Sequence, residues 1–288
     1  MFSLLCLIWG STWMAIKIGL TDAPPMYALS IRFVLSVLMF YAIIAAKRLS
    51  LPSTIKDWLR LGYPGIFIYG IAYALVYWAQ LYISSVLMAV LFASFPFFVA
   101  LLSLSMLKAE RLSPLAWTGL LIGFAGIVVI FYDSLQTSHQ LFIGSLLGLG
   151  GTVAAAVGTV THKRAFAQEN ILVAATVQIT LGTVPVVLVT PFLENLSDFA
   201  ITTESIGSII YLSVVGTVVA FIAYYWLLQN TKAVYASLTA FVVPLVALFI
   251  GVVLFSEPLT LPMLVGTVLI LLGVSMVIKR PGTGTNAA

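Results

Sequence analysis

Long apolar runs alternate along this chain with short polar connections, and the lengths of the runs predict its elements. A helix needs roughly 20 apolar residues to cross the hydrocarbon core of a bilayer, whereas a membrane-spanning strand needs about 10 residues of alternating polarity. The unbroken runs, which contain Gly and Pro, therefore predict helices. Ten spans are expected, over residues 2–20, 26–46, 61–82, 86–107, 115–132, 141–162, 171–192, 207–228, 233–255 and 262–278.

The composition leads to the same class of protein. Hydrophobic residues make up 62% of the chain and charged residues 8%, a balance that the surface of a soluble protein could not accommodate. The expected fold class is an all-α polytopic membrane protein, with the lipid bilayer as its solvent.

Eleven of the 13 Lys and Arg residues lie in alternate connections, and this alternation predicts the orientation. They follow predicted spans 2, 4, 6, 8 and 10, and are Lys47, Arg48, Lys56, Arg60, Lys108, Arg111, Lys163, Arg164, Lys232, Lys279 and Arg280. Because short cytoplasmic loops collect basic residues, both termini are predicted to be cytoplasmic. The net charge of +4 then follows from topology, and nucleic acid is not an expected partner.

The two halves of the chain repeat each other at a spacing near 148 residues. The matched pairs are Ala72 with Ala220, Tyr73 with Phe221, Tyr77 with Tyr225, Trp78 with Trp226, Pro96 with Pro244, Glu110 with Glu257, Gly119 with Gly266 and Gly126 with Gly273. Five spans in each half would make the second half enter the membrane from the opposite side, as in alternating-access carriers. We expect inverted repeats over residues 1–138 and 139–280, followed by a disordered tail over 281–288.

Short motifs in the first two predicted spans carry a family resemblance. The first span contains Trp9-Gly10-Ser11-Thr12-Trp13 and Ile16-Lys17, and the second contains Pro25 and Arg32-Phe33. With twin halves and paired prolines, the chain resembles the EamA type of the drug/metabolite transporter superfamily. Its aromatic density makes it most similar to the YddG-like exporters of aromatic amino acids. The resemblance implies export across a bacterial inner membrane, although Gln178 or a neighbour stands where a counterpart of Arg32 would fall.

The positions of the carboxylates bear on energy coupling. All nine map to connections or helix ends, and are Asp22, Asp57, Glu110, Asp133, Glu169, Glu194, Asp198, Glu204 and Glu257. A proton-coupled carrier usually keeps an acid within the membrane, so facilitated export is expected. His162 is expected to be solvated at the cytoplasmic end of its span. The alternatives are proton-coupled export and export of small aliphatic amino acids, other metabolites or drugs.

Two basic residues, Lys17 and Arg32, lie outside the cytoplasmic pattern. Lys17 is about one turn from the outer end of its span, where its ammonium can extend to the interface or contact an anion. Arg32 lies roughly 10 Å inside its span at 1.5 Å per residue, so we expect it to face the bundle. There it would hold helix-end carbonyls or meet a substrate carboxylate.

Aromatic and hydroxyl side chains predict the substrate pathway. Trp9 and Trp13 share one face of the first span, with Ser11 and Thr12 between them. Helical spacing predicts a stripe in the third span and an equivalent one in the eighth. The stripes consist of Tyr69, Tyr73, Tyr77 and Gln80, and of Phe221 and Tyr225. They are expected to form outer and inner gates around a midplane pocket that offers an aromatic amino acid stacking and cation-π contacts.

The remaining features concern flexibility, packing and chemistry. Pro96 and Pro244 are expected to kink two spans, and a series of glycines is expected to let the fifth and tenth spans pack closely. A monomer is favoured over a dimer.

His139 and His162 are far apart in the sequence, so no metal site is expected, and no cofactor is implied. No catalytic set is present, so an enzyme is not favoured. A receptor or structural protein is not favoured either, because it would give no reason for an inverted repeat.

Overall fold

The computed structural model describes residues 1–107, 113–166, 169–237, 239–254, 256 and 259–278. Lys108, Glu110, Arg111, Glu257, Lys279, Arg280 and the predicted tail lie outside the described residues. In the first half the elements are α1 (Phe2–Gly19), α2 (Pro25–Ala46), α3 (Ile55–Gly65), η1 (Ile66–Ala72), α4 (Tyr73–Tyr82), α5 (Ser85–Phe92), α6 (Phe95–Met106) and α7 (Pro114–Thr137). The second half contains α8 (His139–Phe166), α9 (Ile171–Leu193), η2 (Leu196–Asp198), α10 (Thr203–Ser213), η3 (Val214–Val219), α11 (Ala220–Asn230), α12 (Ala233–Ser237), α13 (Thr239–Leu248), η4 (Phe249–Leu254) and α14 (Leu261–Ile278).

The predicted spans lie in helical segments over the described residues, with a break between Phe92 and Phe95 in the fourth, and several helices extend beyond the predicted bounds. Seven helical stretches are long and apolar enough to cross a membrane: 2–19, 25–46, 55–82, 85–106, 139–164, 171–193 and 203–230. Three further apolar stretches, over 117–130, 242–251 and 261–273, are shorter. The count of ten spans therefore stays a prediction.

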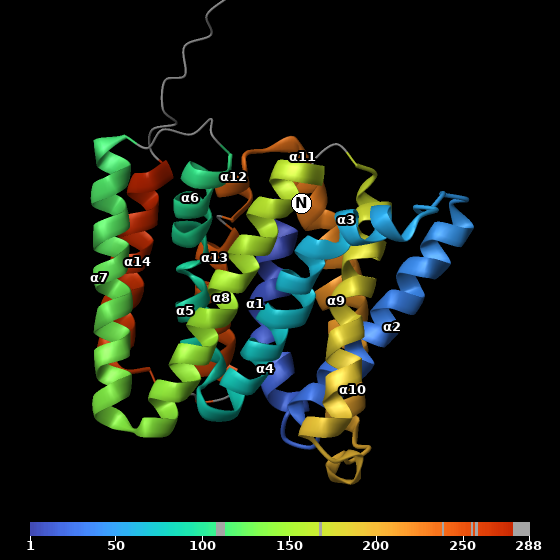
Figure 1. Cartoon of the computed structure of the whole chain (residues 1–288). Coiled ribbons are helices and arrows are strands. Elements are labelled where there is room, and N and C mark those ends of the chain that lie inside the picture. The colour runs from blue at the N-terminus through green and yellow to red at the C-terminus, as the bar shows by residue number, and fades with distance from the viewer. Residues whose placement is uncertain (108–112, 167–168, 238, 255, 257–258, 279–288) are drawn as a thin grey trace, which may run out of the picture.

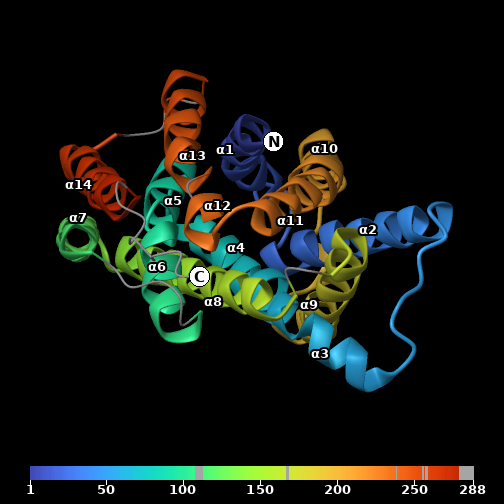
Figure 2. The same ribbon diagram turned by 90° about the horizontal axis from the view of Figure 1, so that it is seen from above.

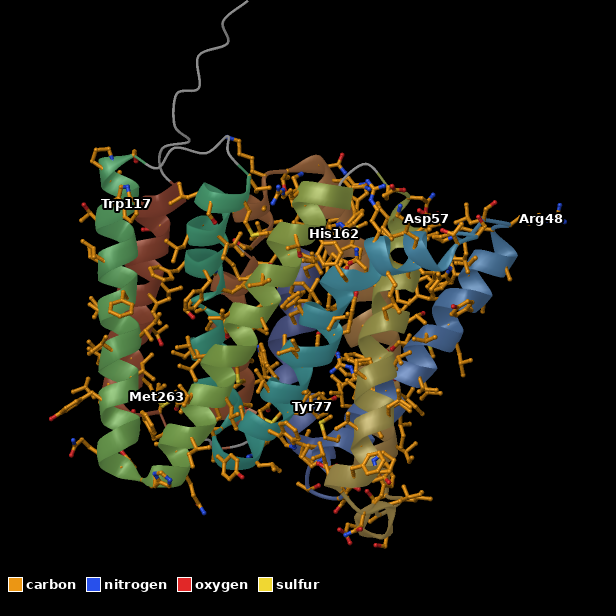
Figure 3. All side chains as sticks on the ribbon, viewed as in Figure 1. Arg48, Asp57, Tyr77, Trp117, His162 and Met263 are labelled. Atoms are coloured by element: carbon orange, nitrogen blue, oxygen red, sulfur yellow. The ribbon has the colours of Figure 1, made fainter. Side chains whose placement is uncertain are left out.

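The helices run side by side between two ends of the molecule (Figure 1). The connections that follow α2, α8 and α11 lie at the upper end of this view, together with the N-terminus, whereas those that follow α1, α4, α7 and α9 lie at the lower end. The side chains labelled Arg48 and Asp57 mark the upper end in Figure 3. The described basic connections are thus gathered at one end, which is the end expected to face the cytoplasm.

Large apolar side chains cover the outside of the bundle. Leu121 and Phe124 on α7, Leu188 and Phe192 on α9, and Leu38 on α2 are all exposed. Apolar patches of this extent occur on proteins whose surface meets lipid or a partner. The core instead holds buried aromatic and hydroxyl side chains, which must find their hydrogen-bond partners inside the protein.

Glycines allow α7 and α14 to pack closely, as predicted, and the two helices lie together at one side of the molecule (Figures 1 and 2). A Cβ atom added at Gly126 would lie 2.7 Å from the carbonyl oxygen of Gly266. One added at Gly273 would lie 2.4 Å from the carbonyl oxygen of Gly119 and 2.5 Å from the amide nitrogen of Gly123. The backbones therefore touch within the same chain.

Segments of π-helix interrupt the helices that contain the predicted gates. η1 joins α3 to α4, and η3 joins α10 to α11, at places 148 residues apart. A π segment widens the hydrogen-bond spacing to i→i+5, so side chains on either side of it depart from the angles of a regular helix. No feature of the apolar sequence predicts these segments.

Glu194 joins the two halves at the lower end of the bundle. Its Oε2 accepts hydrogen bonds from the backbone N–H groups of Met26, at 2.8 Å, and Tyr27, at 3.2 Å, in the first turn of α2. A carboxylate at a helix N-terminus is favourably placed for the helix dipole. Desolvation raises the pKa of the Glu194 carboxyl, against the opposing effect of these two donors.

We predict that Gly273→Ala destabilises the protein by about 1–3 kcal/mol, because the added methyl group overlaps the backbone of α7. The matched control is Gly207→Ala on α10, where an added Cβ has nothing within 4 Å. That change should be neutral or stabilise by up to about 1 kcal/mol, since Ala favours helix over Gly. Thermal unfolding in detergent measures both. Equal melting temperatures for the two variants would contradict the close packing.

We also predict the orientation of the chain in a Cys6→Ser background. Ser53 and Ser197 are both exposed and lie on either side of the predicted membrane. In intact cells, a membrane-impermeant maleimide should label Ser197→Cys and should leave Ser53→Cys unlabelled until the membrane is permeabilised. The reverse pattern would show that the basic end faces outward.

Candidate substrate site and gates

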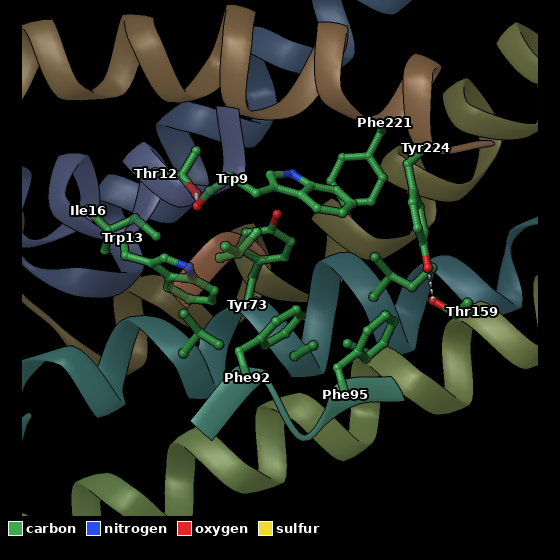
Figure 4. Close-up of a pocket in the computed structure, with 15 residues that line it drawn as sticks. Trp9, Thr12, Trp13, Ile16, Tyr73, Phe92, Phe95, Thr159, Phe221 and Tyr224 are labelled. Carbon is green, nitrogen blue, oxygen red and sulfur yellow. Dashed lines mark hydrogen bonds between the residues drawn. The ribbon is translucent and has the colours of Figure 1, made fainter. Parts of the chain in front are cut away.

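A cavity lies at the centre of the bundle, between α1, η1, α4, α5, α6, α8, α11 and α13 (Figure 4). Its volume is about 70 Å³, and seven of its 15 lining residues are aromatic. These are Trp9, Trp13, Tyr73, Phe92, Phe95, Phe221 and Tyr224. Ligand sites usually have volumes of about 300 Å³ or more, so this cavity is smaller than a typical ligand site.

Five of the residues predicted for the pathway line this central pocket, namely Trp9, Thr12, Trp13, Tyr73 and Phe221. The ring of Trp9 lies 5.0 Å from that of Tyr224 and 5.8 Å from that of Phe221, in edge-to-face contacts. Trp13 lies 5.2 Å from Phe92. Sequence reasoning missed Phe92, Phe95 and Tyr224, because their exposure to the pocket depends on how α5, α6 and α11 are rotated.

The other pathway residues lie outside the pocket. Ser11 is on another face of α1, and its Oγ is 2.6 Å from the hydroxyl of Tyr211 on α10. Tyr69, Tyr77 and Tyr225 are buried between the two halves of the chain. Gln80 is also buried, and its side-chain amide has no hydrogen-bond partner among the described residues.

Arg32 faces the interior of the bundle, as predicted, and is fully buried. Its Nε donates to Thr217 Oγ1 at 3.0 Å, and its Nη1 donates to the Tyr77 hydroxyl at 3.1 Å. The guanidinium carbon lies 4.8 Å from the centre of the Tyr73 ring. The predicted contact with helix-end carbonyls is not what the structure shows. Hydroxyl oxygens and π faces surround the charge instead.

In the second half, an uncharged hydrogen-bond network occupies the place that corresponds to Arg32 by the repeat. Tyr225 donates to Gln178 Oε1 at 2.6 Å, and Gln178 Nε2 donates to His162 Nδ1 at 2.9 Å. The imidazole stacks on the Tyr225 ring at 4.3 Å. His162 is only 1% exposed, so the expectation of a solvated residue was wrong. Lys163, the next residue in the sequence, suggested that His162 lies at the membrane interface, but the helix directs the imidazole into the bundle.

Lys17 holds the end of a neighbouring helix through its ammonium. It donates to the carbonyl oxygens of Gln80, at 2.7 Å, and Ile83, at 3.3 Å, at the C-terminal end of α4. Lys163 donates in the same manner to the carbonyls of Leu228 and Thr231, at the end of α11. A cation is favoured at a helix C-terminus. Each lysine thus fastens the first helix of its half to the end of a helix that contains gate residues.

The two predicted kinks differ from each other. Pro96 occupies the first turn of α6, after a break in the helix between Phe92 and Phe95. Proline is compatible with a helix start because its missing N–H has no partner there. Pro244 lies inside α13, which continues into the π-helix η4. The first proline therefore begins a helix, and the second lies within one.

Together, the lipid-facing exterior and the buried aromatic pocket define a multi-pass membrane carrier, and comparison with known proteins gives its family. The model of the EamA-like transporter family matches residues 1–132 and 142–279. The chain belongs to this family, and it is a membrane transporter of the EamA type in the drug/metabolite transporter superfamily.

Relatives and a solved structure agree with this assignment. An uncharacterized transporter of Archaeoglobus fulgidus is 30% identical over 274 residues, which cover 94% of this chain and 95% of the relative. The uncharacterized inner membrane transporter YedA of Escherichia coli is 26% identical over 257 residues, which cover 89% of this chain and 82% of YedA. A protein of known crystal structure has the same fold, with a TM-score of 0.71, 19% identity, and coverage of 96% of this chain and 95% of its own.

We predict that Gln178→Leu destabilises the protein, because it leaves the Tyr225 hydroxyl proton and His162 Nδ1 without these partners. Each unsatisfied buried group costs about 1–3 kcal/mol. Gln229→Leu, near the end of α11, is the matched control: it removes only an exposed hydrogen bond to the Glu169 carbonyl oxygen and should change stability by no more than about 0.5 kcal/mol. Thermal unfolding compares the two. A melting temperature for Gln178→Leu equal to that of Gln229→Leu would show that the network contributes no stability.

Proposed function

We propose that this transporter exports aromatic amino acids across the bacterial inner membrane by alternating access. The observation that supports this proposal most strongly is the central pocket, whose walls combine Trp9 and Trp13 from the first half with Phe221 and Tyr224 from the second. Aromatic rings stack on one another and attract an ammonium group through their π faces. A phenylalanine, tyrosine or tryptophan would meet both kinds of surface there.

Matched contacts support the proposal that the halves are inverted five-helix repeats, over residues 1–138 and 139–280. Arg32 and Gln178 each bond the tyrosine that corresponds by the repeat, Tyr77 and Tyr225. Lys17 and Lys163 each bind the carbonyls at the end of the corresponding helix. The match of one family model to both halves supports the same proposal. In this arrangement both termini are cytoplasmic and the functional unit is a monomer.

The contacts at the two ends of the pocket suggest how access alternates. Figure 3 places Tyr77 in the lower half of the bundle and His162, which stacks on Tyr225, in the upper half. Tyr69 also donates to Tyr225 at 3.3 Å, so hydroxyl contacts join the halves. In our proposal the Arg32–Tyr77 contact closes the outer gate and the Tyr225–Gln178 contact closes the inner gate. Opening one gate while the other stays closed would move the substrate outward.

The proposed transport is facilitative, since the described carboxylates lie in connections or at helix ends. The burial of His162 is the one observation that favours the alternative of proton coupling, because a buried imidazole can exchange a proton in its span. An imposed pH gradient separates these alternatives. Other metabolites, small aliphatic amino acids and drugs remain alternative substrates, and competition with labelled phenylalanine tests each of them.

We predict saturable counterflow of labelled phenylalanine in proteoliposomes that contain only this protein, at a rate indifferent to a pH gradient. Rates equal to those of empty liposomes would refute aromatic amino-acid transport. A rate that follows the pH gradient and loses this dependence in His162→Asn would establish proton coupling instead.

The same assay tests the pocket. Trp13→Ala and Tyr73→Ala should each lower counterflow at least tenfold, because stacking and cation-π contacts contribute about 0.5–2 kcal/mol apiece in addition to the apolar contact area. The matched controls are Trp117→Ala and Tyr132→Ala on α7, whose side chains are 50% and 66% exposed, and these should transport at the unmodified rate. Unchanged counterflow rates in both Trp13→Ala and Tyr73→Ala would refute the proposal that this pocket binds the substrate.

A further inference from the structure

The pocket is bordered by hydrogen-bond donors that have no partner. Trp9 Nε1 and Trp13 Nε1 are buried without an acceptor among the described residues, and both side chains line the pocket. Arg32 Nη2 is likewise buried without an acceptor. A buried donor without a partner costs free energy, which an acceptor on a ligand, an ordered water or another conformation of the protein recovers. All three groups are therefore available to a ligand that accepts hydrogen bonds.

Arg32 comes close to the pocket at Gly216, on η3. A Cβ atom added at Gly216 would lie 3.0 Å from Thr12 Cγ2, which belongs to a lining residue, and 3.6 Å from Arg32 Nη2. On another side, the pocket residue Tyr73 lies against the guanidinium. A single layer of side chains, those of Thr12 and Tyr73, thus separates the charge from the pocket. A displacement of either side chain would open Arg32 to the pocket.

The charge of Arg32 has no carboxylate partner among the described residues. The acidic side chains that the structure describes are Asp22, Asp57, Glu169, Glu194, Asp198 and Glu204, all in connections or at helix ends. An isolated charge in a low-dielectric interior is costly unless an opposite charge joins it. A bound anion would neutralise Arg32, whereas a zwitterion would leave the positive charge in place and an ammonium ion would add a second one.

We propose that Arg32, with the indole N–H groups of Trp9 and Trp13, forms a carboxylate-binding site at the edge of the aromatic pocket, and that the ligand class is an aromatic carboxylic acid. The amino group is accepted but is not required. This inference rests on the proposed function and widens its substrate class, because an aromatic acid without an ammonium group satisfies the same donors and cancels the buried charge.

The test compares three ligands that share a phenyl ring. Calorimetric titration of the purified protein in detergent uses phenylalanine, 3-phenylpropionate, which lacks the ammonium, and phenethylamine, which lacks the carboxylate. We expect 3-phenylpropionate to bind at least as tightly as phenylalanine and phenethylamine to bind at least tenfold more weakly. Binding of phenylalanine and phenethylamine without 3-phenylpropionate would overturn the carboxylate site and leave aromatic amino-acid export standing. No binding by any of the three would overturn both.

Variants test whether Arg32 is the group that recognises the carboxylate. Arg32→Gln should reduce the affinity for 3-phenylpropionate at least tenfold without reducing that for phenethylamine, so the ratio between the two ligands is the readout. An unchanged ratio would overturn the assignment. If Arg32→Gln does not yield folded protein, Gly216→Ala decides, because it keeps Arg32 and inserts a methyl group between Thr12 and Nη2. It should lower the same ratio, whereas Gly207→Ala should leave it unchanged.

Discussion

A guanidinium buried in the bundle without a described carboxylate is the constraint on which the rest of this structure depends. Water cannot hydrate Arg32 at this depth, so protein groups must surround its charge. Thr217 on η3, Tyr77 on α4 and the ring of Tyr73 do so, and they bring the two halves together around one point. These contacts leave one nitrogen of the guanidinium without a partner among the described residues.

The two ends of the pocket differ in charge although they are built alike. Arg32 bonds Tyr77 in the first half, whereas Gln178, the neutral amide in the second half, bonds Tyr225 and His162. Tyr73 likewise corresponds to Phe221, which has no hydroxyl. An electrostatic field across the pocket therefore follows from a few substitutions between otherwise repeated halves. In the proposed orientation this field draws a carboxylate toward the outer side, which suits an exporter.

Much of this arrangement follows from the sequence, because lipid imposes strict rules on composition. Apolar runs predict the helices, the basic connections predict which end they share, and the cost of an exposed charge places Arg32 inward. The spacing of Trp9 and Trp13 places both on one face of α1, where both reach the pocket. The rest depends on helix rotation and on partners distant in sequence. The burial of His162 could not be predicted, because its partner is the Gln178 amide on α9, and the contacts of Lys17 and Ser11 likewise depend on carbonyls of α4 and on Tyr211 of α10.

In our proposal one pocket binds the aromatic ring of the substrate, and Arg32 receives the carboxylate beside it. Diffraction from crystals grown with 4-bromophenylalanine tests this claim most directly, because the anomalous signal of bromine locates the ring without prior assumptions. We predict one strong bromine peak among Trp13, Phe92 and Phe221, with the carboxylate of the ligand within hydrogen-bond distance of Arg32. A bromine peak elsewhere in the bundle, or a carboxylate directed away from Arg32, would contradict the account.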